Sequence, residues 1–211
     1  FFFFFYIQKF GKFLVFLQKI VQMKKCFFLF FLFPFVAKAQ VLDSASLAQQ
    51  TLFFSFEQTD TIACEKVYRL KFKRKLPNDF SQKILNFPNL QQLILSGVNL
   101  KEIPEQIFEL QNLTYLDLSN NRLKELPAKI GKLSQLQQLI INRNNIAELP
   151  KEIKNLTNLN YLDMWSTLII TLPQEISALD NNLKTIDLRV VNMHDSHKKA
   201  MQELLPNVKI L

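Results

Sequence analysis

Residues 113–135, LTYLDLSNNRLKELPAKIGKLSQ, contain the pattern that decides the fold. Three neighbouring stretches arrange their apolar residues in the same way: LQQLILSGVNLKEIPEQIFELQN (90–112), LQQLIINRNNIAELPKEIKNLTN (136–158) and LNYLDMWSTLIITLPQEISALDNN (159–182). The shared pattern is LxxLxLxxxxLxxLPxxIxxLxx. Its proline recurs at intervals of 23 residues, at Pro104, Pro127, Pro150 and Pro173. A fixed period of this length indicates a repeat architecture.

Each unit changes its apolar spacing halfway along. In LxxLxL, the fourth and sixth positions alternate with polar neighbours, which predicts a short strand with one buried face. In LPxxIxxL, the spacing becomes three and four, which is helical, and the proline stands where no amide donor is needed. One unit cannot bury its apolar face alone, so the units must stack on a shared core.

The repeat frame extends beyond these four units in both directions. A degenerate unit occupies residues 67–89, and a partial unit begins at Leu183. We therefore expect five repeats over residues 67–182, the first of them degenerate, and a partial repeat with a C-terminal cap over 183–211. A helix over about Asp195–Leu205, followed by a final apolar strand, is expected to cover the open end of the core.

This pattern resembles the leucine-rich repeat family, in the 23-residue form with LPxxI that bacterial exported members carry. The resemblance implies an α/β fold: a solenoid, or horseshoe, with a parallel concave β-sheet and short helical or extended convex segments. The family usually has asparagine at the ninth position, where its side chain bonds neighbouring backbone. Asn121 and Asn144 match this position, and the other units have Lys75, Val98, Thr167 and Val191 there. Residues 40–66 are expected to form an N-terminal cap that contains a helix.

The first 39 residues are chemically different from the rest, since 14 of the 21 phenylalanines lie before residue 36. Residues 23–39, MKKCFFLFFLFPFVAKA, have the basic, apolar and small-residue parts of a signal peptide. The apolar run is too short for a stable membrane anchor, which needs about 20 residues. We expect cleavage near Ala39-Gln40 and export to the periplasm, the cell surface or the medium.

Residues 1–22 open with five phenylalanines and contain no methionine. We expect this block to represent translation upstream of a start at Met23, without a function. An extended basic region of the leader, or a real hydrophobic helix, are the alternatives that the sequence leaves open.

The basic character of the chain belongs largely to its N-terminal segment. The whole chain has a net charge of +8, but six lysines precede Gln40 without any acidic residue, which leaves a net +2 for the remainder. We therefore expect no nucleic-acid partner. A local basic patch over residues 66–75 is interpreted as a solvated strand edge. Removal of Cys26 with the leader would leave only Cys64, so no intramolecular disulfide is expected.

No motif predicts catalysis or a cofactor. The three glycines form no phosphate-binding loop. His194 and His197 supply two ligands, whereas a zinc site needs three or four. Asp163 and Asp187 fall on neighbouring expected strands, but no cleft is evident around them. We expect a non-enzymatic protein with neither metal nor cofactor.

In the family, the third, fifth, seventh and eighth residues of each unit project from the concave face or its rim. Tyrosine, tryptophan and arginine are the residues that most often anchor interfaces. The predicted partner-binding residues are Tyr115, Asp117, Arg143, Tyr161, Asp163, Trp165, Asp187 and Arg189. The alternative is that the aromatic residues stack along adjacent strands only to shield the sheet.

These features favour a binding scaffold that contacts another protein through its concave strand face. A protein that binds envelope glycans is one alternative, with Tyr161 and Trp165 stacking on sugar rings. An intracellular regulator of a small GTPase is another, because the LPxxI pattern resembles proteins of that kind. Cleavage of the leader distinguishes the last alternative from the other two.

Overall fold

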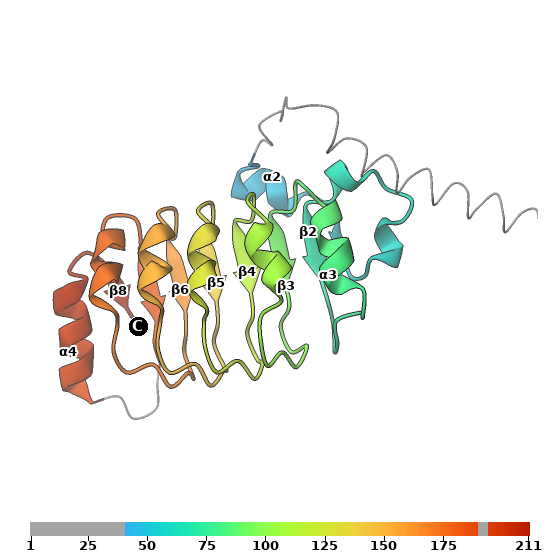
Figure 1. Cartoon of the computed structure of the whole chain (residues 1–211). Helices are drawn as coiled ribbons and strands as arrows, with labels where there is room; N and C mark the ends of the chain where they lie inside the picture. The colour runs from blue at the N-terminus through green and yellow to red at the C-terminus, as the bar shows by residue number, and fades with distance from the viewer. Residues whose placement is uncertain (1–40, 190–193) are drawn as a thin grey trace, which may run out of the picture.

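The computed structural model describes residues 41–189 and 194–211, which form a solenoid around a single parallel sheet (Figure 1). The sheet has eight strands that follow one another in sequence order. The strands are β1 (Leu52–Phe53), β2 (Arg69–Lys71), β3 (Gln92–Ile94), β4 (Tyr115–Asp117), β5 (Gln138–Ile140), β6 (Tyr161–Asp163), β7 (Thr185–Asp187) and β8 (Lys209–Ile210). The predicted fold class, an open parallel-stranded solenoid, is confirmed.

The 23-residue period of the sequence becomes the register of the sheet. Tyr115 of β4 pairs with Gln138 of β5, which in turn pairs with Tyr161 of β6, so residues at equivalent repeat positions lie side by side. The middle residue of each three-residue strand is buried, as Leu139 illustrates with no exposed surface. Its two neighbours in the strand point to the opposite, concave face, because successive side chains alternate across a strand.

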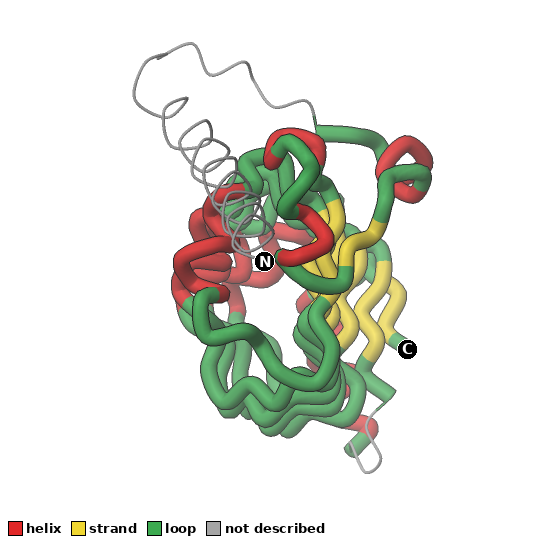
Figure 2. Tube along the Cα trace, turned by 90° about the vertical axis from the view of Figure 1, so that its right-hand side faces the viewer, coloured by secondary structure: helices red, strands yellow, loops and turns green. Residues whose placement is uncertain are grey.

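Short helices cover the side of the solenoid opposite the strands, as Figure 2 shows in end view. Each of the four regular repeats has a 3-10 helix whose N-cap is the repeat's periodic proline, Pro104, Pro127, Pro150 or Pro173. The helices of these repeats are η4 (Glu105–Glu109), η5 (Ala128–Lys132), η6 (Lys151–Asn155) and η7 (Gln174–Leu179). The degenerate repeat has a short α-helix, α3 (Phe80–Lys83), followed by η3 (Ile84–Asn86). The predicted change from strand to helical spacing within each unit is confirmed.

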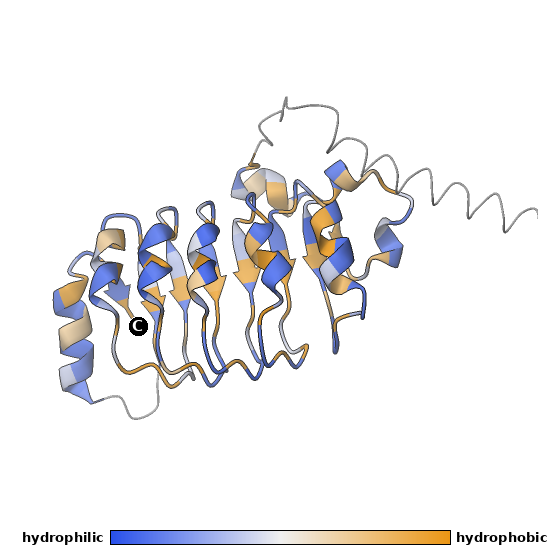
Figure 3. Ribbon diagram, in the orientation of Figure 1, coloured by the Kyte–Doolittle hydropathy of each residue, from blue (hydrophilic) through white to orange (hydrophobic). Residues whose placement is uncertain are grey.

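A single apolar core runs through the whole stack. In the regular repeats it consists mainly of leucine and isoleucine, with Val98, Phe108 and Met164. Colouring by hydropathy shows apolar residues on both the strands and the helices of the stack (Figure 3). At the N-terminal end, phenylalanines replace the smaller residues. Phe56 packs on Phe72 with ring centroids 5.0 Å apart, and Phe72 packs on Phe80 at 5.3 Å. These larger rings fill the end of the core where the repeat pattern degenerates.

Asparagines at the ninth position tie the turns that follow the strands. The side-chain amide of Asn144 donates to the carbonyls of Leu118, Ile141 and Asn142, and its oxygen accepts from the N–H of Leu123. Asn121 makes the same four bonds one repeat earlier. The expected bonds between these side chains and neighbouring backbone are therefore confirmed.

A second row of asparagines lies just before the strands. Each of these side chains donates to a backbone carbonyl of the preceding repeat, at distances of 2.7–2.8 Å. The row consists of Asn89, Asn112, Asn158 and Asn182. Gln135 takes this place in the remaining unit. Together, the two rows of asparagine side chains form hydrogen bonds with backbone groups at both ends of the strands.

Both ends of the described solenoid are closed by non-repeat segments. At the C-terminal end, α4 (Asp195–Leu204) and β8 confirm the expected helix and final strand. At the N-terminal end, the expected helix is α2 (Ser44–Ala48), and two short 3-10 helices, η1 (Glu57–Thr59) and η2 (Cys64–Lys66), follow. Strand β1 was not expected.

Cys64 is disulfide-bonded in the structure of the uncleaved chain. The expectation of no intramolecular disulfide concerned the chain after loss of the leader, and for that chain it stays a prediction. The leader over 23–39 and the block over 1–22 lie outside the described residues. Among the described residues, no helix has the length and apolar character needed to cross a bilayer.

Candidate binding face

The concave face is built from two rows of outward-facing strand residues. The row at the third repeat position contains Gln92, Tyr115, Gln138, Tyr161 and Thr185. The row at the fifth position contains Ile94, Asp117, Ile140, Asp163 and Asp187. Because neighbouring strands lie about 4.8 Å apart, residues of one row are in reach of each other.

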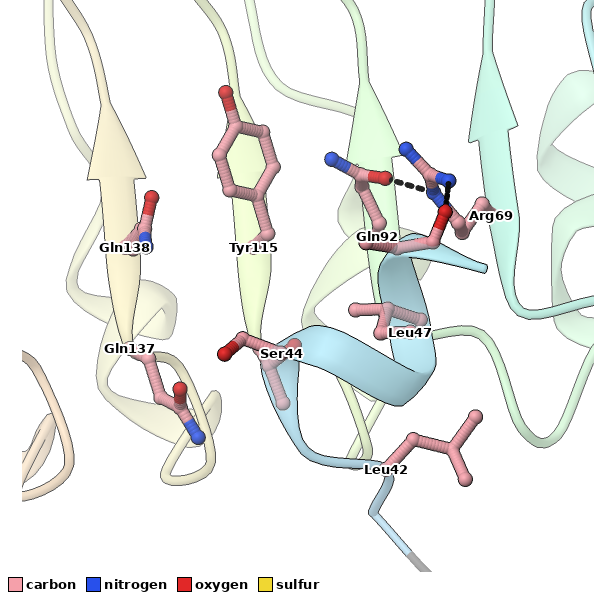
Figure 4. Close-up of a pocket in the computed structure, with 10 residues that line it drawn as sticks. Leu42, Ser44, Leu47, Arg69, Gln92, Tyr115, Gln137 and Gln138 are labelled. Carbon is pink, nitrogen blue, oxygen red and sulfur yellow. Dashed lines mark hydrogen bonds between the residues drawn. The ribbon is translucent and has the colours of Figure 1, made fainter. Parts of the chain in front are cut away.

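Helix α2 lies over the N-terminal half of this face, which the repeat pattern did not predict. The N–H of Leu42 donates to Oε1 of Gln91 at 3.0 Å, just before β3. Arg69 of β2 donates to the carbonyls of Ala48 and Gln50 at 3.0 and 2.9 Å. Figure 4 shows α2 in front of the beginnings of these strands. Over the first strands of the sheet, the chain itself therefore occupies the concave side.

Tyr115 lies at the border of this covered region. Its half-buried side chain lines a cleft between α2 and the strands, together with Gln92 and Gln138 (Figure 4). The sequence analysis grouped Tyr115 with Tyr161 and Trp165. The structure instead places it beside the N-terminal helix.

An aromatic and basic cluster lies on the part of the face that α2 does not cover, on β6 and the turns that follow β5 and β6. The guanidinium carbon of Arg143 lies 4.5 Å from the ring centroid of Trp165, a cation–π contact. The N–H of Arg143 also donates to the carbonyl of Trp165 at 3.0 Å. Tyr161 and Trp165 are half-exposed, and Arg143 is exposed. We call Arg143, Tyr161 and Trp165 the aromatic cluster.

The carboxylates of Asp163 and Asp187 are buried rather than exposed around the aromatic cluster. Asp163 is 8% exposed and Asp187 is 1% exposed. One oxygen of Asp163 accepts from the side-chain amide of Asn142 at 2.7 Å, and Asp187 accepts from Nη2 of Arg189 at 2.6 Å. Asp163 and Asp187 were predicted to contact a partner. Their carboxylates instead accept hydrogen bonds from groups of the protein itself.

A local hydrogen bond explains why the carboxylates turn inwards. The fifth-position aspartates each accept from the backbone N–H two residues later, at 2.9 Å for Asp117 and at 3.4 Å for Asp163 and Asp187. Short aspartate side chains readily form this kind of bond to their own turn. The aspartate row is therefore partly a structural feature of the repeat.

Burial raises the pKa values of three groups on this face, Tyr115, Tyr161 and Asp163. It raises the pKa of Asp163, and the neighbouring carboxylate of Asp187 raises it further. Burial also raises the pKa of Tyr115 to about 12, with added contributions from Asp117 and Asp163. The pKa of Tyr161 is raised for the same kind of reason. Both phenols therefore keep their protons at neutral pH and remain hydrogen-bond donors.

The eighth repeat position has a backbone constraint that the sequence analysis did not identify. Its residues adopt left-handed φ angles between 52° and 69° in the five units from the degenerate repeat onwards. They are Arg74, Gly97, Asn120, Arg143 and Ser166. We had treated this position as open to functional variation, but its conformation costs non-glycine residues about 1–2 kcal/mol. The turn thereby determines where Arg143 leaves the backbone.

The described parts of the chain show no group of three or more His, Cys, Asp or Glu residues placed to hold a metal ion. His194 caps α4, since its Nδ1 lies 2.8 Å from the hydroxyl of Ser196 and accepts from that residue's N–H. His194 therefore has a structural partner at the start of the helix.

Comparisons with known proteins agree with this geometry. A family model described as a leucine-rich repeat region matches residues 62–211. A leucine-rich repeat protein of Leptospira interrogans has a similar structure, with 29% identity and a TM-score of 0.58 over 75% of this chain and 45% of that one. Internalin C2 of Listeria monocytogenes matches at 22% identity and a TM-score of 0.52, over 70% of this chain and 61% of that one.

An internalin (InlF) of the same organism matches at 18% identity and a TM-score of 0.52, over 69% of this chain and 41% of that one. The two internalins, at this level of identity, show the fold alone. The chain spans between 41% and 61% of the length of the three solved proteins. No curated protein sequence gives a significant match.

Proposed function

Since the chain belongs to the leucine-rich repeat family, we propose that it is a binding scaffold whose concave face, over β5 to β7, docks another protein. Family membership supports the scaffold part of this proposal. The position of the aromatic cluster supports the choice of face and of strands.

The observation that carries the proposal is the aromatic cluster on the part of the face that α2 does not cover. Arg143 holds the ring of Trp165 by a cation–π contact, and Tyr161 lies on the adjoining strand β6. Tyrosine, tryptophan and arginine dominate the binding energy of protein interfaces because they bury large, rigid surfaces and keep polar groups. A cluster that is already ordered loses less conformational entropy when a partner binds.

The same geometry favours a protein over a sugar at this position. Sugar binding through Trp165 would need an open ring face together with accessible polar groups beside it that can bond to hydroxyls. The guanidinium of Arg143 lies over the ring of Trp165, and Asp163 and Asp187 are buried. A partner side chain can extend the existing stack, whereas a sugar ring would have to displace Arg143.

The proposal includes export of the mature chain. Its support is the leader-like pattern of residues 23–39, with two lysines, an apolar run and the Ala-Lys-Ala triplet. In this setting the partner would be an envelope or extracellular protein.

A capture experiment tests the proposed face. The tagged chain and its Tyr161→Ala/Trp165→Ala variant are each incubated with envelope and soluble fractions of the source cells, and the bound proteins are identified by mass spectrometry. We expect a specific partner to be retained by the parent chain and lost by the variant.

The control variant is Gln135→Ala, which changes an exposed side chain outside the concave strands. It should retain the partner, and both variants should unfold within about 1 kcal/mol of the parent. Undiminished capture by the double variant would overturn the choice of face.

A further inference from the structure

The cleft between α2 and the sheet is a separate feature from the aromatic cluster. It has a volume of about 140 Å³. The residues that shape it come from α2 and the chain just before it on one side, and from β2 to β5 and the residues before these strands on the other (Figure 4). Those used below are Ser44, Leu47, Arg69, Gln92, Tyr115, Gln137 and Gln138.

Apart from Arg69, the polar side chains that line the cleft are neutral, and several of them are unused. Within residues 41–189 and 194–211, the side chains of Gln137, Gln138 and Tyr115 make no hydrogen bond to other groups of the protein. Each amide has two donors and an acceptor with two lone pairs. Tyr115 adds a phenol that stays protonated, since burial raises its pKa to about 12. These groups offer both donors and acceptors to a ligand.

The one charged side chain that lines the cleft is already engaged. Nη1 of Arg69 donates to the carbonyls of Ala48 and Gln50, and its Nε donates to the side chain of Gln92. These partners are neutral, so the positive charge of Arg69 is not compensated by any lining residue. No carboxylate lines the cleft, so a cationic ligand would find no counter-ion there and its desolvation would go uncompensated. The cleft favours a ligand without positive charge.

The wall formed by α2 is held in place by its own hydrogen bonds. The carboxylate of Asp43 caps the helix by accepting from the N–H groups of Ala45 and Ser46 at 3.0 and 2.9 Å. Leu47 is buried against the sheet, and the N–H of Leu42 is bound to Gln91. A cleft with walls ordered in advance loses little entropy on binding.

We propose that this cleft binds one neutral sugar ring, such as the terminal unit of a glycan. The hydroxyls of a sugar both donate and accept, as the amides of Gln137 and Gln138 do. The ring of Tyr115 and the side chain of Leu47 offer apolar surface to the C–H faces of the sugar. A volume of about 140 Å³ is below the roughly 300–1,000 Å³ of pockets that enclose drug-sized ligands. The cleft therefore accepts one ring rather than an oligosaccharide.

The proposal is tested by titrating the full chain with glucose, galactose, mannose and N-acetylglucosamine, followed by saturation-transfer NMR. At least one of these sugars should bind saturably with a Kd of about 1 mM, and the cationic sugar glucosamine should bind at least about tenfold more weakly. Gln137→Ala and Gln138→Ala should each weaken binding by about three- to tenfold.

Two further variants keep the test independent of folding and of the protein partner. Ser44→Tyr, which fills the cleft from the α2 side, should abolish sugar binding and leave capture of the protein partner unchanged. Gln82→Ala removes an exposed amide on α3, outside the cleft, and should bind sugar like the parent. The absence of saturable binding in the parent, or unchanged affinity in both Gln138→Ala and Ser44→Tyr, would overturn the proposal.

Discussion

Replacing Asn144 with alanine tests the view that asparagines at the ninth position hold the turns of the stack. The side chain is 3% exposed and makes four hydrogen bonds. Its amide donates to the carbonyls of Leu118, Ile141 and Asn142 at 2.9–3.2 Å, and its oxygen accepts from the N–H of Leu123 at 3.1 Å. Alanine would leave the N–H of Leu123 and the carbonyl of Ile141 without these bonds in a site that water reaches poorly. The carbonyls of Leu118 and Asn142 would keep the bonds from Asn121 and from the N–H of Asn120.

The expected loss follows from these four bonds. A buried intramolecular hydrogen bond contributes a net of about 1 kcal/mol, and a buried donor left unpaired costs about 1–3 kcal/mol. We therefore expect Asn144→Ala to lower the free energy of unfolding by about 3–5 kcal/mol, a large part of the roughly 5–15 kcal/mol typical of a domain.

Urea denaturation, monitored by far-UV circular dichroism, measures this loss. The slope of the unfolding free energy against urea concentration shows whether the variant still unfolds in the same transition. The matched control is Asn145→Ala. Asn145 is exposed, and the bond from its N–H to the carbonyl of Leu123 survives the substitution. This control should change stability by less than about 0.5 kcal/mol.

An intermediate variant separates the hydrogen bonds from the volume of the side chain. Thr167 occupies the ninth position of another repeat, where its hydroxyl donates to the carbonyl of Met164 at 2.7 Å. Asn144→Thr should therefore lose less stability than Asn144→Ala. A loss below about 1 kcal/mol for Asn144→Ala, with an unchanged slope, would refute the reasoning.

Two other expectations rest on the structure and one on the sequence. Gly131→Ala should lower the urea midpoint, because the added Cβ would lie 2.8 Å from the carbonyl oxygen of Glu152 in the next repeat. Overpacking of this kind costs about 1–3 kcal/mol. An unchanged midpoint would show that the helices of the two repeats can move apart. Burial raises the pKa of Asp163 above its ordinary 3.8, so the folded state binds this proton more tightly and stability should fall as the pH rises through 3.8 to the raised pKa. Asp163→Asn should reduce this fall in a series of urea titrations at different pH values, and an unaltered pH profile would contradict the assignment. Intact mass and N-terminal sequencing of the protein from its own cells should show Gln40 as the first residue, whereas a chain that begins at Met23 would exclude cleavage at this position.

Much of the fold could be predicted because the period is a local property of the chain. The positions of the leucines determine which residues form strands, and stacking at a 23-residue period determines their register. Gln92, Tyr115 and Gln138 pair as that spacing requires. The asparagines before the strands repeat in the same way, at Asn89 and Asn112 for example.

The candidate site could be predicted only in part. Repeat positions indicated the strands of Arg143, Tyr161 and Trp165, and the contact between Arg143 and Trp165 joins residues on successive repeats. The burial of Asp163 and Asp187 was not predictable from position alone, because it depends on a hydrogen bond that folds each side chain back onto its own turn.

The sequence by itself determined the repeat, the order of the parallel strands and the residues that each strand turns outwards. The reason is that each unit can bury its apolar face only by stacking on its neighbours. Only the tertiary structure decided which part of the concave face stays open. Helix α2 lies outside the repeat, so no periodicity indicates where it packs. Its place over the first strands depends on bonds between segments distant in the chain, from Leu42 to Gln91 and from Arg69 to Ala48 and Gln50.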